Sequence, residues 1–165
     1  MNGRSYVAGG TAGPVGVQQT YAPRSICFGC GPANPGGLHI ASEELPDGSL
    51  LTLFTPQPHH TAFEGFVSGG LLSVLLDCHC NWTAAMALRR AKAMEKPPPT
   101  VTAELAVKYR KPTPLQALTL RAHAVEVLEN RAWVEGSVDV GDDITATARG
   151  LFVIVKPGHP AHGRW

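Results

Sequence analysis

Apolar residues follow two different patterns along the 165-residue chain, one helical and one extended. Residues 68–96, SGGLLSVLLDCHCNWTAAMALRRAKAMEK, contain no proline and are rich in Leu and Ala. Ser68 is a favourable N-cap residue, and basic residues gather near the far end, where the helix dipole favours them. Three prolines at 97–99 then stop the helix. This pattern predicts one long and mostly buried helix.

The segments outside this helix alternate apolar and polar residues, which is the period of a strand. Two short strands are predicted at 38–43 and 49–54, joined by an Asp-Gly turn and followed by a loop. Four longer strands, separated by turns of hairpin length, are predicted at 100–109, 115–128, 131–140 and 143–155. Such strands form an antiparallel sheet. We therefore expect an α+β chain with the hotdog architecture, a long central helix wrapped by a curved antiparallel sheet.

Length and composition predict one domain flanked by tails. The chain is long enough to bury a real core. Gly and Pro are scattered through residues 1–25, so we expect a flexible N-terminal tail there. The folded domain is expected at 26–156 and a C-terminal tail at 157–165.

Charge and cysteine content exclude several classes of function. The formal net charge is +1, which gives no electrostatic reason to expect nucleic acid or an anionic membrane as a partner. The longest apolar run, near residues 69–76, is too short to span a bilayer, and the first residues lack the apolar core of a signal peptide. The four cysteines are expected to be reduced thiols, and the protein is expected in the cytoplasm.

The predicted helix carries one narrow polar stripe. Ser73, Asp77 and Asn81 are spaced at i, i+4 and i+8, so they share a face, and Gly69 and Gly70 extend it toward the helix start. Backbone N–H groups at a helix start lack intrahelical partners and can bind a developing oxyanion. The alternative is structural: the aspartate hydrogen-bonds a nearby loop, and the glycines permit close packing.

The spacing along the helix limits how such a site can be built. Gly69 and Asp77 are eight residues apart, which is about 12 Å along the axis. The Asp77 carboxylate cannot attack a carbonyl held at Gly69 of its own chain. Two antiparallel helices in a two-fold dimer would bring one chain's aspartate to the other chain's glycine, so we expect a homodimer, alone or as a dimer of dimers.

Four segments together resemble the PaaI-type (phenylacetate-degradation type) hotdog-fold acyl-CoA thioesterases, over roughly residues 26–156. They are CFGCGPANPGGLHI, VSGGLLSVLLDCH, VTAELAVKYRKP and ITATARGLFVIV. The family's helix usually begins His-Gly-Gly, with an Asp seven residues after the second Gly, and Gly70 and Asp77 have this spacing. The resemblance implies that Asp77 is the nucleophile or the base that activates water. It also implies that Gly69 supplies the oxyanion-binding N–H and that the Thr102 hydroxyl positions the attacking group.

The chain departs from the family pattern at two positions before the helix. Ser68 replaces the usual His, and Ala62 stands near the position of a family Asn. His59, His60 and Thr61 are the nearest polar side chains. The substrate contacts implied by the resemblance and by position are Ser68, Gly70, Ser73, Asn81, His60, Lys108 and Arg110. The last two are cations that either meet nucleotide phosphates or form a solvated strand end.

Cys27 and Cys30 form a C-x-x-C pair, followed by His39. These residues offer three zinc ligands, but a closed structural site needs four and no second C-x-x-C pair exists. A redox pair and a simple packed turn are the alternatives. Of the three we favour the packed turn, so we expect no metal, and no cofactor other than CoA as part of the substrate.

The function expected from these features is hydrolysis of acyl-CoA or acyl-carrier thioesters to a free acid and a thiol, with Asp77 acting across a dimer interface. The departures before the helix leave a non-catalytic acyl-thioester binding protein as the alternative. A hydratase of the same fold ranks last, because its usual Asp/His loop motif is not found.

Overall fold

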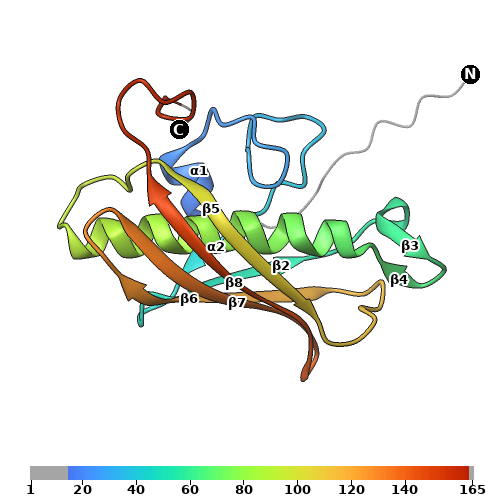
Figure 1. The fold of residues 1–165 in the computed structure, drawn as a ribbon. Helices are drawn as coiled ribbons and strands as arrows, with labels where there is room; N and C mark the ends of the chain where they lie inside the picture. Colours follow the sequence, from blue (N-terminus) through green and yellow to red (C-terminus); the bar gives the residue numbers. More distant parts are fainter. Residues whose placement is uncertain (1–14, 164–165) are drawn as a thin grey trace, which may run out of the picture.

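The computed structural model describes residues 15–163, in which one long helix lies across a curved antiparallel sheet (Figure 1). The hotdog architecture predicted from the sequence is confirmed. Residues 1–14 and 164–165, which belong to the two predicted tails, lie outside the described residues. The elements in chain order are α1 (Val17–Tyr21), β1 (Glu43–Glu44), β2 (Leu50–Phe54), η1 (Pro58–His60), β3 (Thr61–Phe63), β4 (Phe66–Val67), α2 (Gly69–Ala91), β5 (Thr100–Tyr109), β6 (Leu118–Val127), β7 (Arg131–Val140) and β8 (Asp143–Ile154).

Six strands form the main sheet in the order β1-β2-β6-β7-β8-β5, and every neighbouring pair is antiparallel. The four long strands therefore form as predicted. β5 is the last strand in this order, so within the described residues one of its edges has no strand beside it. This edge is ten residues long, and a long unpaired edge is a template for pairing with another chain.

The structure corrects two assignments before the helix. The strand predicted at 38–43 begins only at Glu43, because the Leu38 and Ile40 N–H groups bond to the carbonyls of Phe28 and Gly29 instead of a strand. The loop predicted at 55–67 contains the hairpin β3–β4. Gly65 makes its turn with a positive φ of 80°, which suits glycine.

The helix α2 ends at Ala91, five residues before the position predicted from the prolines. Ala93 takes a left-handed conformation with φ of 49°. Its N–H bonds the Arg90 carbonyl, and the Met94 N–H bonds the Arg89 carbonyl. These two bonds form a Schellman termination, with alanine in the place usually occupied by glycine. At the other end, Ser68 is the N-cap residue, but its side chain makes no capping hydrogen bond.

Most of α2 is buried between the sheet and the N-terminal segment, which runs along the side of the helix away from the sheet (Figure 1). α2 has the length and hydropathy of a membrane-spanning helix, but 83% of its most apolar window is buried inside the fold. Such burial is typical of the core helix of a soluble protein.

The N-terminal segment corrects part of the predicted tail. Residues 15–25 include α1, and Gln18 on this helix is completely buried. The Gln18 Nε2–H donates to Ser42 Oγ (2.9 Å), and the Ser42 N–H donates to Gln18 Oε1 (2.8 Å). These paired bonds hold α1 against the domain, so this part of the chain belongs to the core.

The same polar network reaches His79 in the middle of α2. His79 Nε2 donates to the Leu50 carbonyl (3.1 Å), so Nδ1 is the acceptor and lies 3.0 Å from Ser42 Oγ and 3.2 Å from Thr52 Oγ1. Burial lowers the pKa of His79 from 6.5 to about 4. The imidazole is therefore neutral at pH 7 and links α1, β2 and α2 inside one chain.

Candidate functional site

Asp77 lies half-buried in the middle of α2, on the side that faces β5. Its Oδ1 accepts a short hydrogen bond from Thr102 Oγ1 (2.6 Å). Both residues line a cavity of about 80 Å³ between α2, the start of β5 and the loop that carries Cys27 and Cys30. A hydroxyl donor stabilises the ionised carboxylate and fixes its orientation toward this space.

A bulge in β5 brings Thr102 to the helix side of the sheet. The alternation predicted from the sequence places Ala103 and Leu105 inward together, which would turn Thr102 away from α2. The ladder with β8 instead shifts register between Thr102 and Glu104. Ala103 is consequently exposed, while Thr102 and Leu105 both face the helix side. The bulge is the local reason that Asp77 has a hydroxyl partner.

The other members of the polar stripe also bond to β5. Ser73 Oγ lies 2.7 Å from the Tyr109 hydroxyl. Asn81 is buried, and its Oδ1 accepts a hydrogen bond from Thr100 Oγ1 (2.7 Å). The three polar residues thus lie on one face of α2, as the helical spacing predicts, and this face follows the edge strand β5. Ser73 and Asn81, expected to contact substrate, are engaged with β5, although Asn81 still lines the cavity beside Asp77.

The start of α2 borders a second space, a groove of about 420 Å³ beside Gly69. The Tyr109 hydroxyl donates to the Gly69 carbonyl (2.9 Å), and its ring lies against the glycine. Thr113 lines the groove, and its buried hydroxyl has no hydrogen-bond partner among residues 15–163. The further lining residues include Phe63, Phe66, Arg110 and Lys111. The groove thus combines aromatic walls with Arg110 and an ion-paired Lys111 at a helix N-terminus.

Gly69 and Asp77 border different cavities of the same chain. Asp77 lines the space of about 80 Å³ near the middle of α2, and Gly69 lines the groove at its start. No residue lines both cavities. A single chain therefore holds the two groups apart, as the helical spacing predicts.

His60 lies in η1, where its Nδ1 accepts the Gln57 N–H (2.9 Å) and its ring stacks on Phe54. Partial burial and the neighbouring His59 lower its pKa. The Ser68 N–H donates to the His60 carbonyl (2.9 Å). His60 therefore supports the helix start through its backbone, while its ring nitrogen Nδ1 is already engaged.

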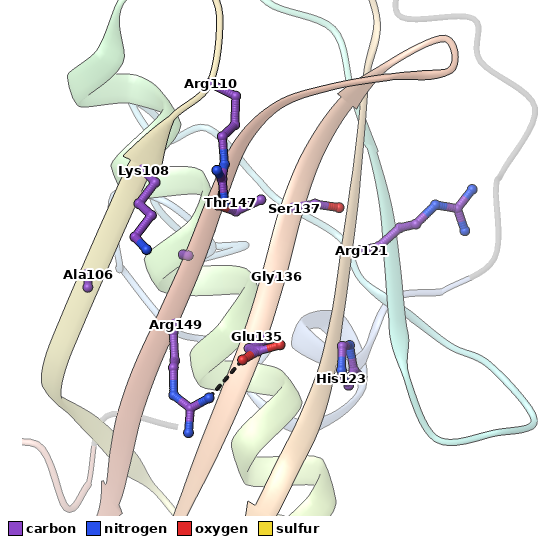
Figure 2. A pocket seen from close by; sticks show the side chains of 11 residues that line it. Ala106, Lys108, Arg110, Arg121, His123, Glu135, Gly136, Ser137, Thr147 and Arg149 are labelled. Carbon is purple, nitrogen blue, oxygen red and sulfur yellow. Dashed lines mark hydrogen bonds and ion pairs between the residues drawn. The ribbon is translucent and has the colours of Figure 1, made fainter.

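Lys108 and Arg110 extend from the outer face of the sheet, with α2 behind it (Figure 2). They line a shallow basin of about 600 Å³ with Arg121, His123 and Arg149. Glu135 lies among these groups and accepts a hydrogen bond from Arg149 (2.8 Å). Lys108 is thus separated from Asp77 by the sheet, whereas Arg110 borders both this basin and the groove at Gly69.

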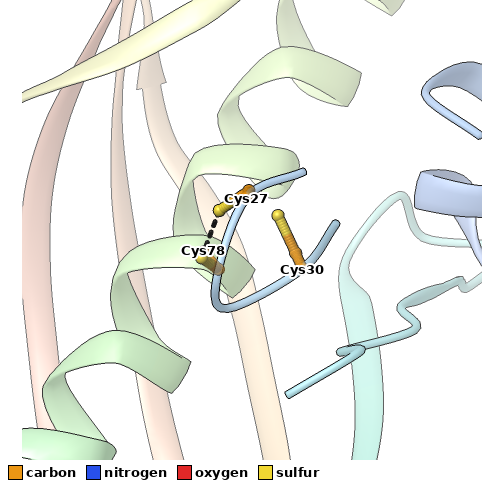
Figure 3. A group of neighbouring side chains, drawn as sticks. All are labelled: Cys27, Cys30 and Cys78. Carbon is orange, nitrogen blue, oxygen red and sulfur yellow. Dashed lines mark hydrogen bonds between the residues drawn. The ribbon is translucent and has the colours of Figure 1, made fainter. Parts of the chain in front are cut away.

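Three thiols meet beside Asp77 (Figure 3). The Sγ atoms of Cys27, Cys30 and Cys78 all lie within 4.8 Å of one another. His39, the third zinc ligand weighed from the sequence, instead hydrogen-bonds the Asn34 carbonyl through Nε2. The third thiol near the C-x-x-C pair therefore comes from α2 and not from the following segment.

No protein-family model matches the chain, and no curated protein matches it either. Solved structures do match. A thioesterase superfamily protein from Shewanella loihica PV-4 is 30% identical, with a TM-score of 0.59, over 71% of this chain and 91% of that chain. This chain belongs to the hotdog-fold thioesterase superfamily.

Two further solved structures match a similar share of this chain. Another thioesterase superfamily protein is 28% identical with a TM-score of 0.65, and the match covers 77% of this chain. This chain spans 62% of that protein's length. A Bacillus halodurans protein solved with CoA is 25% identical with a TM-score of 0.59, over 72% of this chain and 76% of that chain.

Sequence reasoning missed three side chains around the thioesterase-type helix. Tyr109 was assigned only to the strand pattern, although it contacts the start of α2. Thr113 follows Lys111 and Pro112 in the segment after β5, and nothing in its sequence context marks it as buried. Cys78 falls on the predicted core helix, where a thiol usually packs as a small apolar group. Its position next to Asp77, in a chain that also contains a C-x-x-C pair, could have indicated that its thiol lies at the site.

Proposed function

We propose that the protein hydrolyses acyl thioesters of CoA, or of a carrier-protein pantetheine, at sites shared between two copies of the chain. The observation that carries the proposal is the Asp77 carboxylate, which is hydrogen-bonded to Thr102 and faces a cavity on the core helix. Membership of the thioesterase superfamily supports this chemistry. The PaaI type within the superfamily is part of the proposal and rests on the four sequence segments.

The unpaired edge of β5 supports a two-fold partner. Antiparallel pairing of two β5 strands would extend the sheet and set the two α2 helices antiparallel on its same side. If Asp77 of one chain meets Gly69 of the other, the axis passes near Ser73 on α2. On β5 it passes between Thr102, which contacts Asp77, and Tyr109, which contacts Gly69. Both elements thus give a consistent position for one axis.

In this arrangement the reaction divides between the two chains. The Gly69 N–H of one chain binds the thioester oxygen, where negative charge develops as the carbonyl carbon is attacked. Asp77 of the partner chain either attacks that carbon, giving a mixed anhydride that water hydrolyses, or takes a proton from the attacking water. The thiolate leaves in both routes and is protonated, and the acid is released. Thr102 orients the carboxylate.

The groove at the helix start suits the thioester arm of the substrate. Phe63 and Phe66 offer apolar surface, and the centroids of their rings lie 5.0 Å apart. Arg110 borders the same groove and is placed to meet phosphate groups, whereas the Lys111 ammonium is paired with Asp143 (2.6 Å). The proposed steps use no group other than these side chains and the CoA of the substrate, and we propose that the protein acts in the cytoplasm, where its thiols stay reduced.

The test is thiol release from a panel of short, long and aromatic acyl-CoA substrates. Asp77→Asn should lower turnover by about 10²–10⁴-fold, because the carboxylate is the base or the nucleophile. Asp142→Asn removes a carboxylate from an exposed turn and serves as the matched control, with unchanged turnover expected. Melting temperatures of both variants should stay close to that of the wild-type protein.

Two outcomes would overturn the proposal. Unchanged turnover in Asp77→Asn would remove the assigned role of this residue. Tight binding of acyl-CoA by the wild-type protein without any thiol release would instead favour the non-catalytic binding protein. The replacement of the family's His by Ser68 is the observation behind that second candidate.

A further inference from the structure

The thiols of Cys27, Cys30 and Cys78 converge from two segments that are about fifty residues apart in sequence (Figure 3). Cys27 and Cys30 lie on one tight loop, and Cys78 lies on the core helix α2. The Sγ atoms of Cys27 and Cys78 are 3.7 Å apart, which is too far for a disulfide bond. All four cysteines of the chain are free thiols.

The loop backbone is shaped to bring its sulfur atoms onto α2. A Cβ atom on Gly29 would lie 2.4 Å from Cys78 Sγ, so a side chain at this position would block the approach. The Gly31 N–H closes the loop by bonding to the Cys27 carbonyl (2.8 Å). The loop is further tied down by the Leu38 N–H, which donates to the Phe28 carbonyl (2.7 Å). The sulfur cluster is thus held by the fold and is not a chance contact of mobile side chains.

Hydrogen-bond donors surround the sulfur atoms. Trp82 Nε1 donates to Cys30 Sγ (3.3 Å) from the next turn of α2. The Cys30 and Cys78 thiols and the N–H groups of Cys30 and Gly29 hydrogen-bond the Cys27 sulfur. Donors of this kind are the outer contacts that orient metal-bound thiolates.

We propose that Cys27, Cys30 and Cys78 form a three-thiolate binding site for a zinc ion. Zinc binds thiolates at about 2.3 Å in tetrahedral geometry, which separates two ligating sulfur atoms by about 3.8 Å. The observed 3.7 Å between Cys27 and Cys78 matches this separation. The third sulfur needs only a small side-chain adjustment, since all three lie within 4.8 Å.

The cavity beside Asp77 supplies space for the fourth zinc ligand. It measures about 80 Å³ and is lined by all three cysteines together with Asp77 and Thr102. A water molecule occupies about 30 Å³ of liquid volume, so the cavity has room for one on the metal. Three protein ligands with one exchangeable position are typical of an open zinc site and not of a closed structural one.

A disulfide between two of these cysteines explains less of the geometry. It would use two sulfur atoms and leave the third with no role, and it would require a two-electron oxidant. The metal site uses all three sulfur atoms, two of them at their observed separation and the third after a small side-chain adjustment. It also accounts for the donor groups around Cys27 and Cys30, which are the kind of outer contacts that orient metal ligands.

The experiment is a titration of the reduced full-length protein with Co²⁺ under anaerobic conditions. Cobalt substitutes for zinc, and thiolate-to-cobalt charge transfer gives an absorption that carboxylate or imidazole ligands do not give. We expect one equivalent of Co²⁺ per chain, with this absorption and tetrahedral d–d bands, and loss of both on adding Zn²⁺. Cys27→Ala and Cys78→Ala should each abolish the absorption.

Cys80→Ala is the matched control, because Cys80 is buried on the same helix but packs in a separate core cluster. It should bind one equivalent like the wild-type protein. If Cys78→Ala does not fold, Cys27→Ala decides the question, since Cys27 is only partly buried. A reduced wild-type protein without charge-transfer absorption, or a Cys27→Ala variant that matches Cys80→Ala, overturns the proposal. These readouts do not depend on thioesterase activity.

Discussion

Two polar groups two residues apart on α2 have opposite surroundings. His79 is enclosed, and each of its ring nitrogens is bonded to a group from the same chain. Asp77 is half-buried, and it lies against a cavity and beside the unpaired edge of β5. A polar group that one chain satisfies completely stabilises the fold. The proposed function uses the second kind of group, because Asp77 lies beside open space at an edge strand.

After Asp77→Asn, the largest effect that would sharpen this comparison is expected at Gly69, the first residue of α2. Gly69→Pro removes the N–H assigned to the oxyanion, and proline is well tolerated at the first helical position. Ser68 already has the extended backbone that precedes proline, with ψ of 132°. We expect turnover to fall by about 10²–10³-fold, measured by thiol release.

Gly69→Ala is the control for this substitution. It adds a Cβ atom 3.3 Å from the Tyr109 ring, the same crowding that proline introduces, but keeps the N–H. We expect it to retain most of the turnover. Equal losses in the two variants would mean that crowding at Tyr109, and not the missing donor, controls the rate.

The second effect is a fall in the free energy of unfolding at low pH, which arises from His79. Its pKa in the folded protein is about 4, below its ordinary value of 6.5. Below pH 6.5 the unfolded chain binds a proton that the folded chain does not, so stability is lost as pH falls toward 4. The loss reaches about 2 kcal/mol at pH 5. Urea unfolding at pH 7 and pH 5 measures it.

His79→Leu should remove this contribution to the pH dependence. The variant should also be less stable at pH 7 by about 1–3 kcal/mol, because the Leu50 carbonyl loses the His79 donor and the Ser42 hydroxyl loses the His79 acceptor. His123→Gln, at an exposed position of β6, should keep the wild-type dependence. A His79→Leu protein that still loses the full amount between pH 7 and pH 5 would contradict the enclosed neutral imidazole.

The smallest effect is expected at Thr102. Thr102→Val keeps the shape of the side chain but removes the donor to Asp77, so turnover should fall by about tenfold. Thr102→Ser keeps a hydroxyl and should stay within about twofold of the wild-type rate. Steady-state thiol release distinguishes them, and a serine variant as slow as the valine variant would show that the methyl group matters more than the hydrogen bond.

The sequence predicted the elements whose pattern is long and regular. The four long strands and the core helix each extend over many residues, so the periodicity outweighs local exceptions. The shared face of Ser73, Asp77 and Asn81 follows from helical spacing alone. The end of α2 could not be predicted in this way. It depends on a left-handed Ala93, whereas the prolines at 97–99 indicated a later stop.

The parts of the site that the sequence did not reveal depend on contacts between distant segments. The bulge that turns Thr102 toward Asp77 is a register shift against β8, and neither strand signals it alone. Cys78 meets Cys27 only because the N-terminal loop lies on α2. Such contacts need the tertiary fold, and periodicity describes one segment at a time.

The claim that each active site combines Asp77 of one chain with Gly69 of the other is tested most directly by mixed dimers. Asp77→Asn and Gly69→Pro chains carrying different affinity tags are co-expressed, and dimers that contain both tags are isolated. One of the two sites in such a dimer then has both native groups, so we predict about half of the wild-type rate, although each parent is nearly inactive. Mixed dimers as inactive as their parents, or a chain that remains monomeric, would contradict the shared site.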